Sequence, residues 1–222
     1  MTALLVLVTF LIFVILDYVL NRKTVVQPAM PTSAGPAPDP GNDYVEGFLV
    51  PDNRSYHPGH SWVLRERKNL VRVGADEFAA VLAGKIDRIE FPKPGTWIRQ
   101  GQKFASFWRN GQKTEMVSPT EGEVTEINDE VVHDPSLVRH DPYGKGWLLS
   151  VHVPDEESTG RNLVPHKLIR EWMRQAVEAL YKRQPALAGM AVGAGGHPAE
   201  DLLAGIPGAK WAEVTREFFL TA

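Results

Sequence analysis

The hydrophobic positions at the start of the chain form one continuous run. Residues Ala3–Leu16 are apolar apart from Thr9, and no polar stripe divides them. Continued through Leu20, the run predicts a helix of about 27 Å, which is close to the hydrocarbon thickness of a bilayer. A cleaved signal peptide is disfavoured, because no basic residue precedes the run and no small-x-small site follows it directly. We therefore expect a transmembrane anchor over residues 1–23.

Charged and aromatic residues at the end of this run orient the expected anchor. Arg22 and Lys23 follow the run, whereas no lysine or arginine precedes it. The positive-inside rule then predicts a single pass through the inner (cytoplasmic) membrane, with the N-terminus outside and the C-terminal bulk in the cytoplasm. Tyr18 suits the lipid interface, and Asp17 is either solvated at the helix end or in contact with a neighbouring membrane subunit.

Prolines dominate the segment that follows. Residues 24–43 contain five prolines and two glycines, a composition that excludes an α-helix or a central strand. We expect an extended linker over residues 24–55, whose Pro-rich part could reach up to about 60 Å. It serves either as a tether or as a strap along partner surfaces.

From Tyr56 onward the pattern changes to short apolar runs broken by glycine, proline and polar residues. This pattern predicts a mainly β domain over residues 56–155, either a β-sandwich or a flattened barrel. The expected strands lie at 62–64, 70–73, 86–91, 97–98, 104–108, 114–117, 122–127 and 147–153. A short helix is expected at Asp76–Leu82, with Gly84 as its stop.

The strongest turn signal in this domain is Asn110-Gly111, which is flanked by β-forming and polar residues. An Asn-Gly pair favours a two-residue type I′ hairpin turn, because both positions need a positive φ. We therefore expect a hairpin whose tip is Asn110-Gly111.

Helical spacing returns in the last part of the chain, which forms a helical extension over residues 156–222. Apolar residues between Val164 and Leu180 predict an amphipathic helix over Pro165–Arg183, with Pro165 in its first turn. A final short helix is expected around Trp211–Phe219.

The polar side of the longer helix is basic, and two interpretations of it remain open. Arg170 and Arg174 belong to this basic side. The helix either packs on the β domain with a solvated basic face, or uses these residues with Trp172 to dock on a partner or on anionic lipid headgroups.

Composition and motifs narrow the possible chemistry. The 222-residue chain has a net charge of −3 and no cysteine, so there is no electrostatic case for nucleic-acid binding, and thiolate metal sites, disulfides and a cysteine nucleophile are excluded. The sequence contains no phosphate loop, G-x-S-x-G, H-E-x-x-H or G-x-G-x-x-G motif. His133, Asp134, His140 and Asp141 are near one another in sequence, but their spacing does not match a ligand set. We expect no catalytic residue, cofactor or metal.

Between Tyr56 and Val151 the chain contains a series of short motifs. They are Tyr56, His60, Trp62-Val63, Val73-Gly74, Phe78-Ala79, Leu82-Ala83-Gly84, Phe91-Pro92, Gly95, Gly101, Ser118-Pro119, Gly122-Glu123-Val124, Asp134-Pro135, Leu137-Val138, Asp141-Pro142-Tyr143-Gly144 and Gly146-Trp147-Leu148. In their residues and their order they resemble the motifs of the H protein of the glycine cleavage system. The resemblance implies a barrel-sandwich hybrid fold that presents a lipoyl-lysine on a hairpin.

The hairpin is where the chain departs from that family. When Phe104–Pro119 is aligned without gaps, the acceptor lysine of the family falls on Gly111, and the acidic residue three positions earlier falls on Trp108. Glycine has no side chain to acylate. Lys113 is the nearest substitute, but we expect it on the returning strand and not at the tip.

These observations predict a non-enzymatic accessory subunit of a membrane-bound complex of energy metabolism, respiratory or photosynthetic. Its expected partners are the lipid bilayer and integral membrane subunits, and its H-like domain would stabilise their assembly. One alternative is a membrane-tethered lipoyl or acyl carrier that uses Lys113. A further alternative is a ligand-binding module that uses the groove of the hairpin.

Overall fold

The computed structural model describes residues 44–155, 157, 160–185, 187, 201–204 and 210–221. The chain divides into two units, Met1–Pro38 and Asp39–Ala222, and every described residue belongs to the second. The expected anchor and the Pro-rich part of the linker therefore lie outside the described residues. Within the described part, no helix is both long and apolar enough to cross a membrane.

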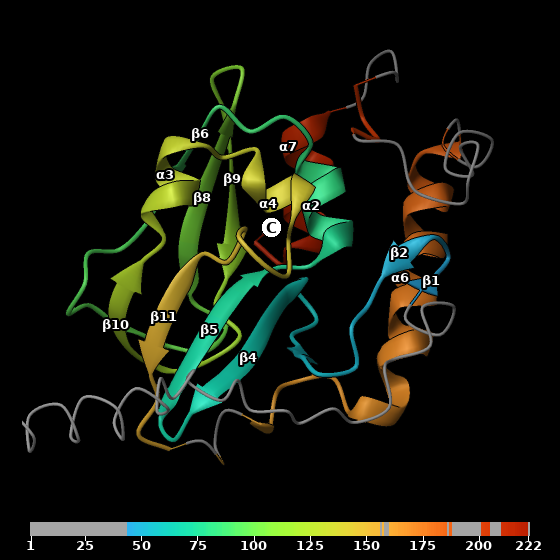
Figure 1. Ribbon diagram of the computed structural model, residues 1–222. Helices are drawn as coiled ribbons and strands as arrows, with labels where there is room; N and C mark the ends of the chain where they lie inside the picture. Colours follow the sequence, from blue (N-terminus) through green and yellow to red (C-terminus); the bar gives the residue numbers. More distant parts are fainter. Residues whose placement is uncertain are drawn as a thin grey trace, which may run out of the picture. The chain divides into compact units, whose positions relative to one another are not determined.

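The larger of two main sheets has six strands, all paired antiparallel (Figure 1). In spatial order they are β3 (Ser55–Tyr56), β4 (Ser61–Arg67), β5 (Leu70–Ala75), β11 (Leu149–His152), β10 (Gly122–Ile127) and β7 (Trp97–Ile98). Alternation along the strands buries one face: Val71 and Val73 are buried, whereas Arg72 between them is half-buried.

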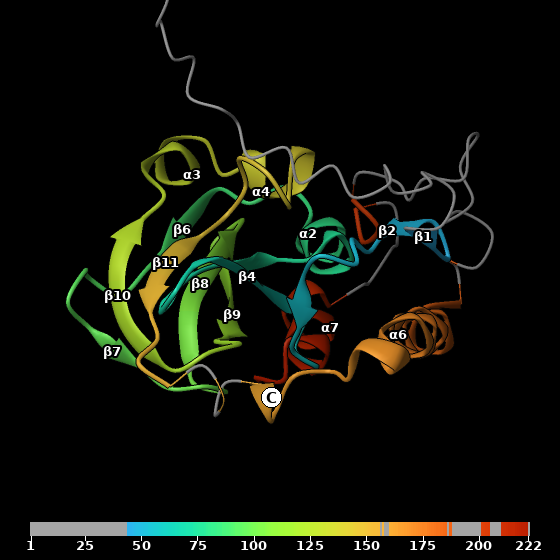
Figure 2. The ribbon, with the colours of Figure 1, turned by 60° about the horizontal axis from the view of Figure 1, so that its bottom comes forward.

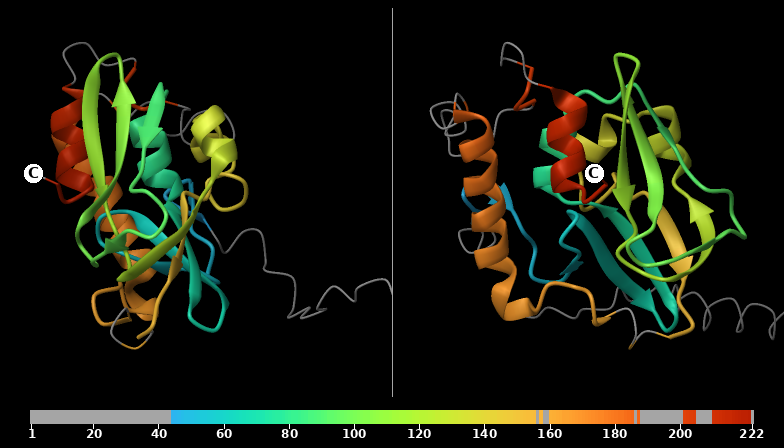
Figure 3. Two further views of the ribbon diagram at one scale, coloured as in Figure 1. Left: turned by 90° about the vertical axis from the view of Figure 1, so that its left-hand side faces the viewer. Right: turned by 180° about the vertical axis from the view of Figure 1, so that it is seen from behind.

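The smaller sheet has three strands in the order β6 (Arg88–Glu90), β8 (Lys103–Arg109) and β9 (Gln112–Val117). It lies across the larger sheet, as Figures 1 and 3 show from opposite sides. Phe104, Phe107 and Met116 of this sheet are buried in the common core. The predicted mainly β, sandwich-like domain is confirmed.

Three short helices cover one end of the sheets. The helix α2 (Glu77–Ala83) matches the predicted one; the Asp76 carboxylate accepts a hydrogen bond from the Ala79 amide at its start, and Gly84, with φ 65°, ends it. The helices α3 (Asp129–His133) and α4 (Leu137–His140) were not predicted from the sequence. Both are only one or two turns long, too short for hydrophobic periodicity to reveal.

The last part of the segment predicted as a linker, residues 24–55, contains regular structure. Residues Tyr44–Val45 and Phe48–Leu49 form a small hairpin, β1 and β2. Val45, Phe48 and Val50 are buried, and the Phe48 ring meets the Phe78 ring edge-on at 5.3 Å. The closely spaced prolines end at Pro40, and the apolar residues that follow pack into the core.

The two predicted C-terminal helices are present. A 3₁₀ turn, η1 (His166–Leu168), leads into α6 (Ile169–Arg183), whose buried residues are Ile169, Met173, Val177 and Leu180. Figure 2 shows α6 beside the β1–β2 hairpin. The last helix, α7 (Trp211–Phe218), contacts α2 and β9.

Side chains from elsewhere cover one edge of the smaller sheet, the edge formed by β9. Three alternate carbonyls of this strand accept hydrogen bonds. Lys113 O accepts from the Arg216 guanidinium at 3.3 Å, Glu115 O from the Thr221 hydroxyl at 3.3 Å, and Val117 O from the Ser61 hydroxyl at 2.9 Å. Two of these donors come from the C-terminal segment.

Candidate functional site

The hairpin between β8 and β9 closes as the sequence predicts. Arg109 pairs with Gln112, which leaves Asn110 and Gly111 as the two turn residues. Their φ angles are 48° and 75°, both in the left-handed region that a type I′ turn requires. The turn is exposed, so the tip projects from the domain.

Gly111 occupies an open position at this tip. A Cβ atom built on Gly111 would meet no other atom within 4 Å. Crowding therefore does not explain the missing side chain. The backbone angle does carry a cost for any other residue, because a positive φ brings Cβ close to the backbone.

Asp87 fastens the tip from the neighbouring segment. The Asn110 amide donates a hydrogen bond to the Asp87 carboxylate at 2.6 Å, and the Asp87 amide donates to the Trp108 carbonyl at 2.8 Å. These two bonds hold the turn against the start of β6.

Arg109, the residue before the turn, is held from the other side. Its guanidinium makes two bonds to the Asp201 carboxylate, at 2.8 and 3.1 Å, and both side chains are mostly buried. The same guanidinium donates to the Ala83 carbonyl at 3.3 Å and lies 5.9 Å from the Trp211 ring. A bidentate ion pair of this kind fixes geometry as well as charge. The C-terminal extension therefore holds the base of the tip.

Trp108 takes the place of the acidic residue that the resemblance leads us to expect. It lies in one cross-strand row with Arg88 and Lys113 on the smaller sheet. The Arg88 guanidinium lies 4.4 Å from the indole ring, and the Lys113 ammonium lies 5.9 Å from it. The flank of the tip is thus an aromatic ring between two cations.

Lys113 lies on β9 and not at the tip, as predicted. Its ammonium is 2.9 Å from the Glu115 carboxylate, and Lys103 contacts the same carboxylate at 2.9 Å. Hydrogen bonds from Lys103 and then Lys113 hold the pKa of Glu115 below its ordinary value. Acylation of Lys113 would remove one of the two cations that stabilise this carboxylate.

The three helix residues expected to meet a partner have contacts inside the chain. The Trp172 ring stacks on His60, with 4.7 Å between the ring centres. Arg170 donates to the Tyr44 carbonyl at 3.1 Å, and Arg174 pairs with Glu171 on α6 itself and lies 3.8 Å from the Glu46 carboxylate. These residues join α6 to the rest of the domain and are not brought to the hairpin tip.

The other expected partner residues, Asp17, Tyr18, Arg22 and Lys23, lie outside the described residues.

His60 has a structural environment. Its ring bonds to the buried Asp76 carboxylate at 2.8 Å and is stacked between Phe78 and Trp172. Within the described part of the chain, no three histidine, aspartate or glutamate side chains are grouped as a metal site would require. The pair formed by His60 and Asp76 therefore serves packing between α2, α6 and the sheet.

Three residues around the tip, Asp87, Asp201 and Arg88, were not predicted from the sequence as part of the site. Asp201 is 92 residues from Arg109, so no local spacing could have connected them. Of the three, only Arg88 could have been placed from the sequence. Alternation along the expected strand at 86–91 puts Arg88 on the same face of the sheet as Glu90.

Comparison with known proteins gives a family match over more than half of the chain. The family model described as Glycine cleavage H-protein matches residues 54–176. A glycine cleavage system H protein of Mycobacterium leprae is 34% identical over 106 residues, which cover 48% of this chain and 80% of that protein. The H protein of Bifidobacterium longum is 34% identical over 119 residues, covering 54% and 86%. That of Carboxydothermus hydrogenoformans is 33% identical over 126 residues, covering 55% and 96%.

Among solved structures, a glycine cleavage system H protein from Mycobacterium marinum is similar, with a TM-score of 0.48 and 26% identity. The match covers 57% of this chain and 98% of that one.

Proposed function

This chain belongs to the glycine cleavage H-protein family, and we propose that it is a member without a lipoyl group that acts as a non-catalytic accessory subunit. The observation that carries the proposal is Gly111 at the exposed hairpin tip, where the family places its acceptor lysine. A swinging arm needs a lysine amine at that point. The hairpin around Gly111 is complete, so the domain still presents the surface of the hairpin. It lacks the lysine to which a lipoyl group would be attached.

The surroundings of the tip support this proposal. A lipoate ligase must bind the exposed tip of the hairpin. Next to the acceptor position, Trp108 replaces the acidic residue of the family, and the Arg88 guanidinium lies over its ring. Arg109 and Asp201 hold the base of the tip through a mostly buried pair. We propose that the hairpin serves as a fixed contact surface.

The alternative is a membrane-tethered lipoyl or acyl carrier that uses Lys113. Its favouring observation is that the Lys113 side chain is 39% exposed, so a ligase could reach the amine. Its position on β9 and its pairing with Glu115 weigh against it.

A lipoylation assay tests the two proposals against each other. The full chain is incubated with a lipoate ligase, lipoate and ATP, and its intact mass is measured. The H protein of Mycobacterium leprae serves as the positive control, and Lys113→Arg as the matched variant. We expect no adduct on this chain. An adduct that disappears in Lys113→Arg would establish the carrier alternative.

We further propose that residues 1–23 anchor the protein in the inner membrane, with the linker and the cytoplasmic domain beside integral membrane subunits of a respiratory or photosynthetic complex. The support is the apolar run followed by Arg22 and Lys23. Membrane fractions washed with alkaline carbonate should retain the full chain and release a chain that begins at residue 44. Gentle-detergent purification should then yield it with membrane subunits; consistent recovery of a free monomer would contradict the accessory role.

A further inference from the structure

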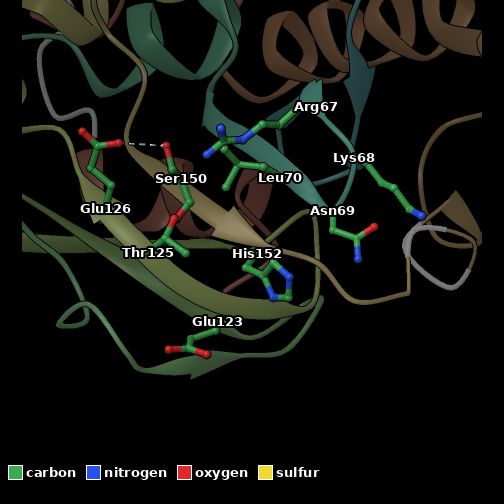
Figure 4. A pocket seen from close by; sticks show the side chains of 9 residues that line it. All are labelled: Arg67, Lys68, Asn69, Leu70, Glu123, Thr125, Glu126, Ser150 and His152. Atoms are coloured by element: carbon green, nitrogen blue, oxygen red, sulfur yellow. Dashed lines mark hydrogen bonds between the residues drawn. The ribbon is translucent and has the colours of Figure 1, made fainter.

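A polar groove of about 520 Å³ lies on the outer face of the larger sheet, away from the hairpin tip. Its lining residues are Arg67, Lys68, Asn69, Leu70, Glu123, Thr125, Glu126, Ser150 and His152 (Figure 4). The volume falls in the range of small-molecule sites, and the polar lining suits a charged ligand more than an apolar one.

The strand register arranges charges across this groove in order. Arg67 on β4 pairs with Leu70 on β5, Leu70 pairs with His152 on β11, and His152 pairs with Glu123 on β10. Paired residues point to the same face of a sheet. A single row across four strands therefore runs from a cation, over leucine and histidine, to a carboxylate.

A β-bulge stands on each side of the groove. One lies between Arg65 and Arg67 on β4, and the other lies between Val124 and Glu126 on β10. Bulges redirect side chains and are frequent beside functional sites. Figure 4 shows the result: the Arg67 guanidinium extends over Leu70 toward Ser150, and Glu126 lies on the other side of Ser150.

The charges of the groove do not neutralise one another. Within the described residues, the side chains of Arg67, Lys68, Glu123 and His152 make no hydrogen bond or ion pair. Glu126 contacts only the Ser150 hydroxyl, at 3.5 Å, which is a weak bond. On the smaller sheet the pattern is the opposite, since Arg88 pairs with Glu90 at 3.1 Å. The groove thus keeps a cationic and an anionic wall available at the same time.

We propose that this groove binds a zwitterion that carries a phosphate and a primary ammonium group, the chemistry of phosphoethanolamine. Arg67 binds the phosphate with its guanidinium, which extends toward Ser150. Glu126, on the other side of Ser150, accepts from the ammonium. The planar fork of the Arg67 guanidinium donates to two phosphate oxygens at once, which suits it to phosphate recognition. The source is either a lipid headgroup or a free molecule.

Histidine NMR on the full chain in mild detergent tests this proposal. The chain is labelled in its histidine rings, the His152 signal is assigned with His152→Gln, and O-phosphoethanolamine is added. We expect a saturable shift with a dissociation constant on the order of 1 mM, as suits so small a ligand. Arg67→Gln and Glu126→Gln should each weaken binding roughly tenfold, whereas Lys182→Gln, on the far helix α6, should not change it.

Two comparisons decide the ligand and its source. Inorganic phosphate and ethanolamine are added separately, and the full chain is also placed in phosphatidylcholine nanodiscs with and without phosphatidylethanolamine. A His152 shift that appears only with phosphatidylethanolamine identifies a lipid headgroup, and one that appears only with the free compound identifies a soluble ligand. The absence of any shift, or an equal shift with phosphate alone, would overturn the proposal.

Discussion

At the scale of single residues, Gly111 combines an open environment with a φ of 75°. The two facts have different consequences for substitution. The space permits any side chain, but the backbone angle penalises all of them, because only glycine adopts this region without contact between Cβ and the backbone. Asn110 accepts its own positive φ of 48° because asparagine tolerates this conformation.

The Gly111→Ala variant isolates that backbone effect. We expect it to lower the free energy of unfolding by about 1 kcal/mol, since the added methyl group meets only its own backbone. Gly160→Ala is the matched control, because Gly160 has the same open surroundings without a positive φ. Urea unfolding measures both. Equal stabilities of the two variants would show that the turn does not impose its angle.

His57 makes stability depend on pH. Burial, and secondarily the charge of His60, lower the pKa of His57 from 6.5 to about 4. Between these two pH values the unfolded chain binds the proton and the folded chain does not. The contribution is therefore complete above pH 6.5 and is lost as the pH falls toward 4, by on the order of 2 kcal/mol.

The His57→Asn variant should remove this acid sensitivity. The asparagine oxygen can accept the hydrogen bond that the Gly59 amide now donates to the His57 ring at 3.0 Å. Urea unfolding at pH 7.5 and pH 5 measures the effect, with His166→Asn as the exposed control. An unchanged loss of stability at pH 5 in His57→Asn would contradict the assignment.

At the scale of elements, features that depend on neighbouring residues could be predicted from the sequence, and features that depend on distant residues could not. The Asn110-Gly111 turn, α2 and α6 were predictable, because turn chemistry, capping and periodicity are read within a few neighbouring residues. The pair formed by Arg109 and Asp201 was not predictable, because it depends on a tertiary approach between distant segments. The groove of Arg67 and Glu126 depends on two bulges, which leave no mark in the sequence pattern.

The ion pair between Arg109 and Asp201, which holds the base of the hairpin, leads to a prediction at the scale of elements. Asp201→Asn leaves the mostly buried Arg109 guanidinium without a charged partner, so it should lower the free energy of unfolding by about 2 kcal/mol. Amide hydrogen exchange at Asn110 and Gly111 should become faster. Glu213→Gln breaks the exposed pair with Lys210 and should change stability by less than about 0.5 kcal/mol. Unchanged amide hydrogen exchange at the tip would show that the ion pair between Arg109 and Asp201 does not restrain the turn.

At the scale of the whole molecule, the folded domain extends beyond the boundary that the sequence indicated. The β1–β2 hairpin contributes Val45, Phe48 and Val50 to the core, and the Tyr143 hydroxyl donates to the Leu49 carbonyl at 2.7 Å. Turn residues and prolines on both sides of this hairpin concealed it, because two-residue strands carry too little alternation to be recognised.

Two shortened chains, beginning at residue 44 and at residue 56, test this boundary. The longer one should unfold with a free energy roughly 4 kcal/mol higher, because the shorter one exposes the cavity that three apolar side chains fill. Phe48→Ala in the longer chain should give an intermediate value. Equal denaturation midpoints for the two chains would place β1 and β2 outside the cooperative unit.

The covered edge of β9 limits how this domain can meet other chains. Strand addition, whether by a partner peptide or by another copy during aggregation, needs free carbonyls along an edge. The Arg216, Thr221 and Ser61 side chains already occupy three alternate carbonyls of β9. Loss of α7 and the residues after it would release two of them, so proteolysis ahead of α7 would turn a protected edge into a template for self-association.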